Sequence, residues 1–361
     1  MQGSFKEKIL KIFENVPKMD KMGFLSSFFK TTEEDYTDAE FIDLDIVRGS
    51  EEVAPVIRNL GDGAVTIADD VFTGKSVKPP VYVLDRPVNI FDLMKRQPGE
   101  NEYAAIGTWY ARLFNILKRA FVIMFGMLKR SVELQASQVL QTGTITLTDD
   151  QGKPAYTLDF KPKNTHIKEV TTKWDQTGAD PIEDLRAVMD AIRTDGFVEA
   201  TTAIMGAAAF DKFISNEKVL KQFEKDKLNL GALSPRLVNK GAKYQGYLEM
   251  GAYRLDIFTY NGRYQEFGTK APKKFVDDDK VIILADVEDL DFRCVYGGVP
   301  SLGMDAPFTE IVPETVTYEG GIRFHNRAYK DQKKNTYTAE TTVRPICIPV
   351  SIDRFGCLTV L

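Results

Sequence analysis

The longest regular pattern of apolar residues lies in residues 101–140, where apolar positions recur every three or four residues. They are Ile106, Tyr110, Leu113, Leu117, Phe121, Met124, Leu128 and Val132. This spacing places all of them on one face of an α-helix. Pro98-Gly99 and Gly143 are suitable borders for that helix. At 1.5 Å per residue, roughly forty residues span about 60 Å, which is longer than an ordinary globular helix.

Two shorter patterns precede this helix. Apolar residues at helical spacing among lysines predict a short basic amphipathic helix from Phe5 to Val16. An apolar cluster at residues 24–29 then leads into an acidic, extended stretch at residues 31–45. Neither segment has enough apolar residues for a core of its own. We therefore expect an arm that lies on neighbouring surfaces.

Residues 49–98 have little helical periodicity and many turn-forming residues. Strand-like runs at residues 64–68 and 81–84 flank the sequence Thr73-Gly74-Lys75-Ser76. The pattern predicts a long two-stranded excursion with a glycine tip near Gly74. An excursion of about fifty residues without its own core is usually a functional or interaction element.

Strands and helices alternate after the long helix. A hairpin is predicted at residues 144–147 and 155–160, helices at 180–193 and 207–224, and strands at 199–205, 254–260 and 281–285. Residues 337–361 alternate and carry Pro345 and Pro349, which favours edge strands. The apolar chain end, residues 358–361, is expected to pair into a sheet. The fold class is therefore α+β.

Composition and charge exclude several classes of protein. The chain has 361 residues, 43% of them hydrophobic, with 47 Lys and Arg against 52 Asp and Glu. This excludes a disordered or collagen-like protein, and the acidic balance disfavours one whose main task is to neutralise phosphates. The most apolar run, residues 120–128, is about nine residues long, whereas a membrane-spanning helix needs about twenty. We expect a soluble chain without an export signal.

Few residues could carry catalysis. The chain has two His and three Cys, His166, His325, Cys294, Cys347 and Cys357, without the spacing of a zinc site or a disulfide framework. Gly74-Lys75-Ser76 matches part of a phosphate-binding loop. That loop needs a glycine where this chain has Asp69, and Pro79-Pro80 cannot begin the required helix. We expect no catalytic residue, cofactor or metal, and a nucleotide-binding enzyme using Lys75 and Ser76 is a remote alternative.

Several motifs follow one another in a distinctive order. They are Phe28-Phe29-Lys30-Thr31-Thr32, Asp43-Leu44-Asp45, Val53-Ala54-Pro55-Val56, Val77-Lys78-Pro79-Pro80, residues 92–100, Ile145-Thr146-Leu147, Asp159-Phe160, Trp174 and Asp180-Pro181. In their order and spacing the chain resembles the lambda-type major capsid protein E family of bacteriophages, which has the Hong Kong 97 fold. The likeness covers about residue 24 to the end, so the first two dozen residues look like an addition.

The resemblance implies a division of the chain and a function. Residues 1–48 would form an N-terminal arm, 49–98 an extended β-hairpin loop, 99–177 a peripheral domain with the long helix as its spine, 178–304 an α/β axial domain, and 305–361 a return to the peripheral domain. The protein would be a major capsid protein that self-assembles into the icosahedral head shell of a tailed phage around double-stranded DNA. The shell would be assembled in the host cytoplasm.

The resemblance also implies partners and contact residues. The partners would be copies of the chain itself in pentamers and hexamers, scaffolding, portal and decoration proteins, and packaged DNA through weak non-specific contacts. The candidate subunit-contact residues are Phe28, Phe29, Phe41, Gly74, Lys75, Lys78, Pro79 and Pro80. Some relatives crosslink a loop lysine to an asparagine of a neighbour. The candidate donors here are Lys75 or Lys78 and the candidate acceptors Asn326 or Asn335, but no motif marks such a pair. A shell subunit of an encapsulin nanocompartment is the alternative within the same fold.

Overall fold

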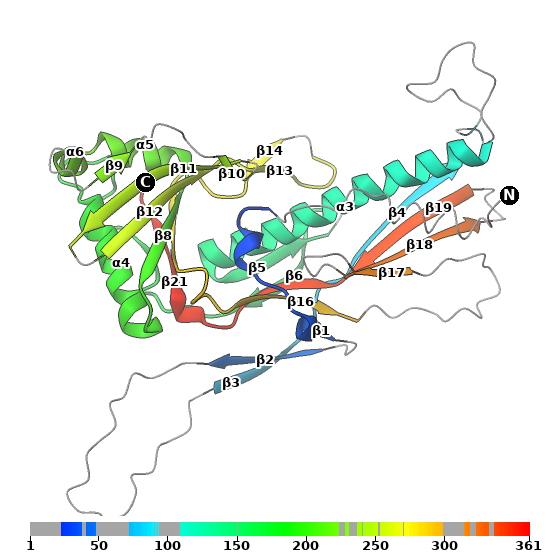
Figure 1. Cartoon of the computed structure of the whole chain (residues 1–361), viewed down its shortest axis with the longest axis horizontal. Helices are drawn as coiled ribbons and strands as arrows, with labels where there is room; N and C mark the ends of the chain where they lie inside the picture. The colour runs from blue at the N-terminus through cyan, green and yellow to red at the C-terminus, as the bar shows by residue number, and fades with distance from the viewer. Residues whose placement is uncertain are drawn as a thin grey trace, which may run out of the picture.

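The computed structural model describes most of the chain (Figure 1). The described residues are 23–37, 41–47, 72–89, 91, 93, 109–149, 151–223, 228–230, 237–239, 241–251, 253–269, 271–298, 314–317, 323–331 and 336–361. The helix predicted at residues 5–16 and the strand predicted at residues 64–68 lie outside them.

The longest element is the helix α3 (Trp109–Thr142), which confirms the prediction for this region. Its 34 residues extend about 50 Å at 1.5 Å per residue. The six predicted stripe residues from Leu113 to Val132 are at most 4% exposed. The helix ends at Gly143, which has a φ of +66° and whose N–H donates to the Val139 carbonyl at 2.8 Å. Glycine adopts this left-handed conformation without steric cost, so the helix ends where the sequence predicts.

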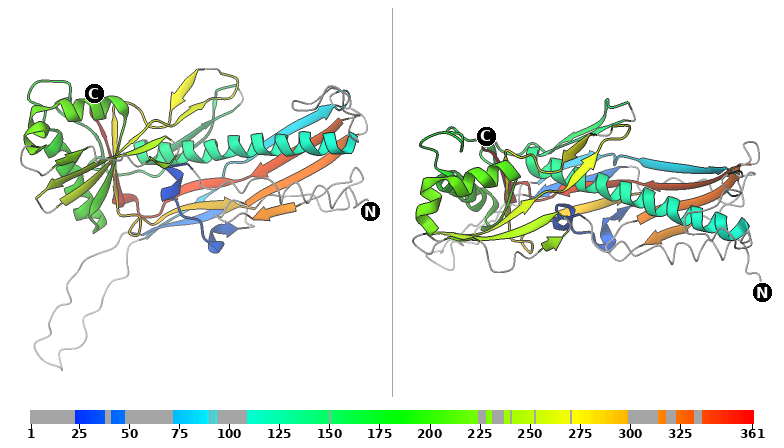
Figure 2. Two further views of the ribbon diagram at one scale, coloured as in Figure 1. Left: turned by 45° about the horizontal axis from the view of Figure 1, so that its top comes forward. Right: turned by 90° about the horizontal axis from the view of Figure 1, so that it is seen from above.

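A four-stranded antiparallel sheet runs along α3 (Figures 1 and 2). Its strands, in spatial order, are β17 (Glu314–Thr317), β18 (Arg323–Asp331), β19 (Thr336–Val343) and β4 (Tyr82–Asn89). Ala328, Ala339 and Val343 of this sheet are buried in the same cluster as the inner face of α3. The strand predicted at residues 81–84 therefore exists, but its partner is β19, and its place in the excursion is a wrong prediction.

The opposite end of the molecule contains an eight-stranded mixed sheet (Figure 1). Its spatial order is β10-β11-β12-β8-β15-β21-β7, and β9 pairs with β11. The strands are β7 (Ile167–Glu169), β8 (Ala200–Met205), β9 (Leu228–Leu230), β10 (Leu237–Asn239), β11 (Ala242–Met250), β12 (Tyr253–Tyr260), β15 (Lys280–Ala285) and β21 (Phe355–Thr359). The predicted strands at residues 199–205, 254–260 and 281–285 are confirmed as β8, β12 and β15.

Three helices accompany this sheet: α4 (Pro181–Gly196), α5 (Ala207–Ser215) and α6 (Glu217–Phe223). α4 begins as predicted, with Pro181 in the first turn and the Asp180 carboxylate accepting the Glu183 N–H at 3.3 Å. The single helix predicted over residues 207–224 is wrong, because Asn216 has an extended backbone with ψ of 132° and separates α5 from α6. The Asn216 side chain accepts the Lys218 N–H at 2.9 Å, which starts the second helix.

Smaller elements join the two ends. They are η1 (Ser26–Phe28), η2 (Glu33–Asp35), β1 (Tyr36–Thr37), the hairpin β5 (Thr144–Thr148) and β6 (Pro154–Asp159), β13 (Arg263–Gln265), β14 (Pro272–Lys274), β16 (Phe292–Gly297), β20 (Pro345–Pro349) and η3 (Ile352–Arg354). The β5–β6 pairing confirms the hairpin predicted after the long helix.

The strands of residues 337–361 divide among three sheets. The first of them, β19, lies between β18 and β4, so the edge-strand prediction is wrong for it. β20 is an edge strand of the sheet β1-β16-β20, as Pro345 and Pro349 at its ends predict. β21 is paired on both sides, with β15 and β7, so the edge-strand prediction is wrong for it. Leu358 and Phe355 are fully buried, which is typical of an interior strand. The last strand thus lies in the eight-stranded sheet, where it also contacts α3.

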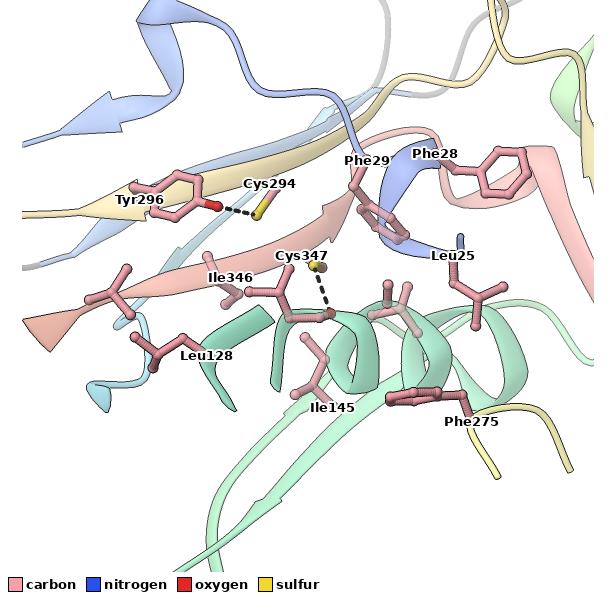
Figure 3. Close-up of a cluster of buried hydrophobic side chains, with 14 of the residues drawn as sticks. Leu25, Phe28, Phe29, Leu128, Ile145, Phe275, Cys294, Tyr296, Ile346 and Cys347 are labelled. Atoms are coloured by element: carbon pink, nitrogen blue, oxygen red, sulfur yellow. Dashed lines mark hydrogen bonds between the residues drawn. The ribbon is translucent and has the colours of Figure 1, made fainter. Parts of the chain in front are cut away.

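Two apolar clusters form the core. The larger surrounds α3 and includes the N-terminal residues Leu25, Phe28 and Phe29 (Figure 3). The second lies between α4 and the eight-stranded sheet and includes Trp174 and Phe213, whose rings are 5.9 Å apart. Each end of the molecule therefore has its own buried centre.

Candidate subunit-contact surfaces

A two-stranded ribbon leaves the body of the molecule (Figure 1, lower left). It consists of β2 (Ile42–Val47) and β3 (Phe72–Val77), paired antiparallel from Ile42 opposite Val77 to Val47 opposite Phe72. Ile42 and Val77 are 7% and 5% exposed and join the larger core cluster, so they fix the base of the ribbon. Its strand β3 lies within the predicted excursion, whereas β2 lies in the stretch that was expected to belong to the N-terminal arm.

The residues Gly74 and Lys75 lie inside this ribbon. Gly74 pairs with Asp45, and Lys75 pairs with Leu44. The prediction of a hairpin tip near Gly74 is therefore wrong, because the turn-forming composition of residues 73–76 is overridden by strand pairing. The same geometry excludes a phosphate-binding loop, which requires a loop that opens a helix.

The base of the ribbon exposes two of the candidate contact residues. The Phe41 side chain is 51% exposed, and the Lys78 ammonium lies 5.9 Å from the centre of its ring, within cation–π range. Pro79 is buried, and a Cβ placed on Gly297 would lie 2.9 Å from the Pro79 Cγ. Pro80 is half-buried. Pro79 thus packs against the end of β16, while Phe41 and Lys78 are exposed.

Phe28 and Phe29 pack within their own chain, which is a correction to the expectation that this apolar cluster needs a neighbouring surface. They are 6% and 3% exposed. The Phe29 ring stacks on Phe292 with centroids 5.2 Å apart, and Phe28 meets Phe24 edge-on at 5.5 Å. The cluster is too short to be a core alone, but it completes the core formed by distant elements (Figure 3).

A buried carboxylate holds the start of this segment in place. Glu133 of α3 is 2% exposed and accepts the backbone N–H groups of Leu25 and Ser26, each at 2.9 Å. It also accepts the Tyr260 hydroxyl of β12 at 2.8 Å. Burial, followed by the neighbouring Glu133 charge, raises the pKa of Tyr260, so this hydroxyl keeps its proton and remains a donor. Glu133 therefore joins η1, α3 and β12.

A pocket of about 560 Å³ lies between η2 and the start of β16. Its lining is rich in charged side chains: Lys30, Thr32, Glu34, Asp35, Glu288, Asp289, Leu290, Asp291, Phe292, Arg293 and Arg354. Asp35 is 4% exposed; its carboxylate accepts the Thr32 N–H at 2.6 Å and lies 3.8 Å from Arg293. The ion pair between Asp35 and Arg293 thus joins η2 to β16. Across the described part of the chain, no group of His, Cys, Asp or Glu side chains could hold a metal ion.

The solvent-facing side of α3 carries only basic charges. We define the outer face of α3 as Asn115, Arg119, Val122, Ile123, Gly126 and Arg130. Val122 and Ile123 are 39% and 48% exposed, and Lys118 and Lys129 border the face. No acidic residue occurs in α3 before Glu133, which is buried. Sequence reasoning concentrated on the apolar stripe of this helix and missed its opposite side, although the absence of acidic residues is visible in the sequence.

The thiols and the buried histidine His166 have structural roles. Cys294, Cys347 and Cys357 are free and buried, as expected for reduced thiols, although Cys294 and Cys347 face each other across β16 and β20 (Figure 3). Burial raises the pKa of Cys357 to about 12, so little reactive thiolate forms at neutral pH. His166 is fully buried, with its ring nitrogens 2.9 Å from the Phe355 carbonyl and 3.0 Å from Asp195.

Two further observations limit what the described residues can do. Asn326, one of the two candidate crosslink acceptors, is fully buried in β18, so its side chain cannot reach a lysine of another subunit in this conformation. Asn335 lies outside the described residues.

None of the described helices is long and apolar enough to cross a membrane.

The fold of the chain is similar to that of a solved prophage protein. The putative capsid protein of a prophage of Escherichia coli CFT073 matches with a TM-score of 0.61 at 16% identity, over 100% of both chains. A structure from Gordonia phage Cozz matches with a TM-score of 0.48 at 11% identity, and the match covers 94% of this chain and 87% of that chain. The SrpI encapsulin of Synechococcus elongatus PCC 7942 matches with a TM-score of 0.45 at 9% identity, and the match covers 96% of this chain and 91% of that chain. No curated protein matches the sequence.

The first of these structures defines the class of fold, that of a phage capsid protein. The family model "Phage major capsid protein E" matches residues 7–356, and the chain therefore belongs to that family. The match begins at residue 7, so the interpretation of the first two dozen residues as an addition is wrong. The protein is a structural component of the phage head, whose shell is built from many copies of it.

Proposed function

We propose that this chain self-assembles into the icosahedral head shell of a tailed phage and encloses its double-stranded DNA. The observation that carries the proposal is the β2–β3 ribbon, which leaves the body and keeps Phe41 and Lys78 exposed at its base. A ribbon with two strands and no covering layer is marginally stable alone, and burial on a neighbouring subunit stabilises it. Repetition of one such contact around symmetry axes closes a shell.

Within this proposal the candidate contact residues divide into two groups. Phe41 and Lys78 contact a neighbouring subunit directly, with Pro80 beside them, and Gly74 and Lys75 contribute through the ribbon. Phe28, Phe29 and Pro79 act indirectly, since they pack the arm and the ribbon base against the body. The arm, extended loop, peripheral domain and axial domain keep the roles that the family resemblance implies, with α3 as the spine.

The proposed partners are a scaffolding protein and a portal during assembly, a decoration protein on the finished head, and packaged DNA through non-specific contacts. The net charge of −5 supports a container, because a strongly basic wall would hold the incoming polyanion. The protein acts without catalysis, which the burial of all three thiols, the raised pKa of Cys357 and the strand conformation of residues 74–76 support.

The test is expression of the full chain with and without its assembly partners, followed by sedimentation and negative-stain electron microscopy. We expect closed shells or tubes tens of nanometres across in at least one condition, and DNA inside particles from infected cells. Shells that hold an enzyme in place of a genome would support the encapsulin alternative. A stable monomer or dimer in every condition would contradict the shell function itself.

A further inference from the structure

The outer face of α3 has no partner within the described part of the chain. The guanidinium groups of Arg119 and Arg130 are exposed and form no ion pair with a described carboxylate. Val122 and Ile123 lie between them and are also exposed. This combination differs from an ordinary solvated helix face, which mixes acidic and basic residues and has few adjacent exposed aliphatic side chains.

The charge of this face indicates which partners it can attract. Its two exposed basic residues, Arg119 and Arg130, are separated by about three turns, or some 16 Å along the helix axis. No acidic side chain of α3 offsets them at the surface. On a chain with a formal charge of −5 this is a local excess of positive charge. It attracts a partner with carboxylates or phosphates at the matching spacing.

The shape and the apolar surface of this face indicate whether the partner is a protein or a nucleic acid. Gly126 lies between Arg119 and Arg130, about one turn before the latter, and a Cβ built on it would meet only the tip of the Arg130 side chain, 3.6 Å away. A second backbone can therefore approach the helix closely at this point. Val122 and Ile123, one turn before it, supply aliphatic surface that a phosphate backbone would not cover. The centre of the face thus favours a protein partner over a nucleic acid.

We propose that the outer face of α3 binds an amphipathic helix whose aliphatic stripe is flanked by Asp and Glu, supplied by an assembly partner of the shell. The aliphatic stripe would cover Val122, Ile123 and Gly126, while the acidic flanks would pair with Arg119 and Arg130. Helix-in-groove recognition of this kind places anchors at three- and four-residue spacing. The inference rests on the proposed shell function, because it assigns a docking surface to an assembly partner.

The test uses the purified full-length protein under conditions in which sedimentation shows it unassembled. The probe is a fluorescent 18-residue peptide designed as an amphipathic helix with Leu on one face and Glu on both flanks. A peptide of the same composition with a scrambled order, and an 18-base-pair DNA duplex, are the comparison ligands. Binding is measured by fluorescence anisotropy at two salt concentrations, so that purely electrostatic attraction is separated from apolar contact.

We expect the amphipathic peptide to bind about tenfold more tightly than the scrambled one, because only the former covers the aliphatic centre. The double variant Arg119→Glu and Arg130→Glu should weaken binding about tenfold or more. Gly126→Leu should also weaken it, since the new side chain blocks close approach. The matched control, Lys153→Glu with Lys243→Glu, reverses two exposed basic residues elsewhere and should leave the affinity unchanged.

Three results would overturn the proposal. Equal binding of both peptides, with tighter binding of the duplex, would make the face a nucleic-acid surface. An equal loss in the control variant would show attraction to net charge alone, and absence of peptide binding would show that the face is merely solvated. Thermal unfolding of each variant verifies that it is folded. Shell formation by the unmodified protein is scored separately, so failure of the shell function and failure of this docking surface remain distinguishable.

Discussion

At the scale of single residues, buried polar groups connect segments that are far apart in the sequence. Glu133 has three donors from two other elements, and His166 and Lys163 converge on Asp195. A buried acceptor with several donors is costly to remove, because each abandoned donor loses its only partner. Two predictions follow at this scale.

Glu133→Ala should lower the free energy of unfolding by about 3 kcal/mol, since it leaves the N–H groups of Leu25 and Ser26 and the Tyr260 hydroxyl without an acceptor. Glu133→Gln should lose less, because its amide oxygen still accepts. Denaturant unfolding of the unassembled subunit measures both changes. Glu249→Gln, an exposed position on β11, is the control and should change little. An unchanged stability of Glu133→Ala would contradict the anchoring role.

Asp195→Asn should reduce stability in a pH-dependent way. Burial opposes ionisation of Asp195, but hydrogen bonds from Lys163 and His166 outweigh it, so the pKa of Asp195 is lowered. A carboxyl whose folded pKa lies below its unfolded value stabilises the fold above about pH 4, and this stabilisation disappears as the pH falls through the folded pKa.

The variant should therefore be less stable by about 1 kcal/mol at pH 7, and the difference should shrink as the pH falls below 4. Thermal unfolding from pH 7 to pH 3 measures this. The matched control is Asp175→Asn, because Asp175 is exposed. A difference that stays constant down to pH 3 would contradict the role of the ionised carboxylate.

At the scale of elements, local sequence and tertiary contacts decide helix and strand ends differently. α3 ends at Gly143, where the backbone is left-handed and where a Cβ would lie 2.4 Å from the Pro162 Cγ. The C-terminal end of α3 thus depends both on the ability of Gly143 to adopt a left-handed backbone and on the segment around Pro162 that packs against it. By contrast, residues 73–76 have turn chemistry but lie in a strand, because β2 provides a pairing partner.

Gly143→Ala should lower the free energy of unfolding by about 2 to 4 kcal/mol. The alanine would have to adopt the unfavourable left-handed backbone conformation, and its Cβ would collide with Pro162. In the matched variant Gly152→Ala the alanine also has to adopt a left-handed backbone conformation, with a φ of +78°, but nothing lies within 4 Å of the new Cβ. It should lose only about 1 to 2 kcal/mol. Thermal unfolding compares the two, and equal losses would show that the contact with Pro162 gives way at no cost.

At the scale of the whole molecule, the two ends have separate cores, and the ribbon joins the larger one through its base residues Ile42 and Val77. α3 connects the ends, since its inner face packs in one cluster with β19 and with β15. A ribbon that extends from this body adds little to the stability of an isolated subunit. Its contribution is expected in the assembled shell, where neighbouring copies cover it.

Replacement of residues 49–70 by a two-residue Asn-Gly turn should therefore abolish shell formation while the subunit stays folded. The thermal midpoint of the subunit should change by no more than a few degrees, since the base residues Ile42 and Val77 remain in the core. Sedimentation and negative-stain electron microscopy measure assembly. A variant that still forms closed shells would contradict the contact role of the loop.

The sequence by itself determined the elements whose signals are local: the long helix from its apolar spacing, the start of α4 from Asp180-Pro181, and the edge strand β20 from its two prolines. The order of its motifs also determined the family. Only the tertiary structure decided the position of Gly74 within a strand, the interior place of β21, the burial of Phe28 and Phe29, and the anchor at Glu133. These depend on partners more than a hundred residues away or on strand pairing, and such contacts leave no periodic pattern along the chain.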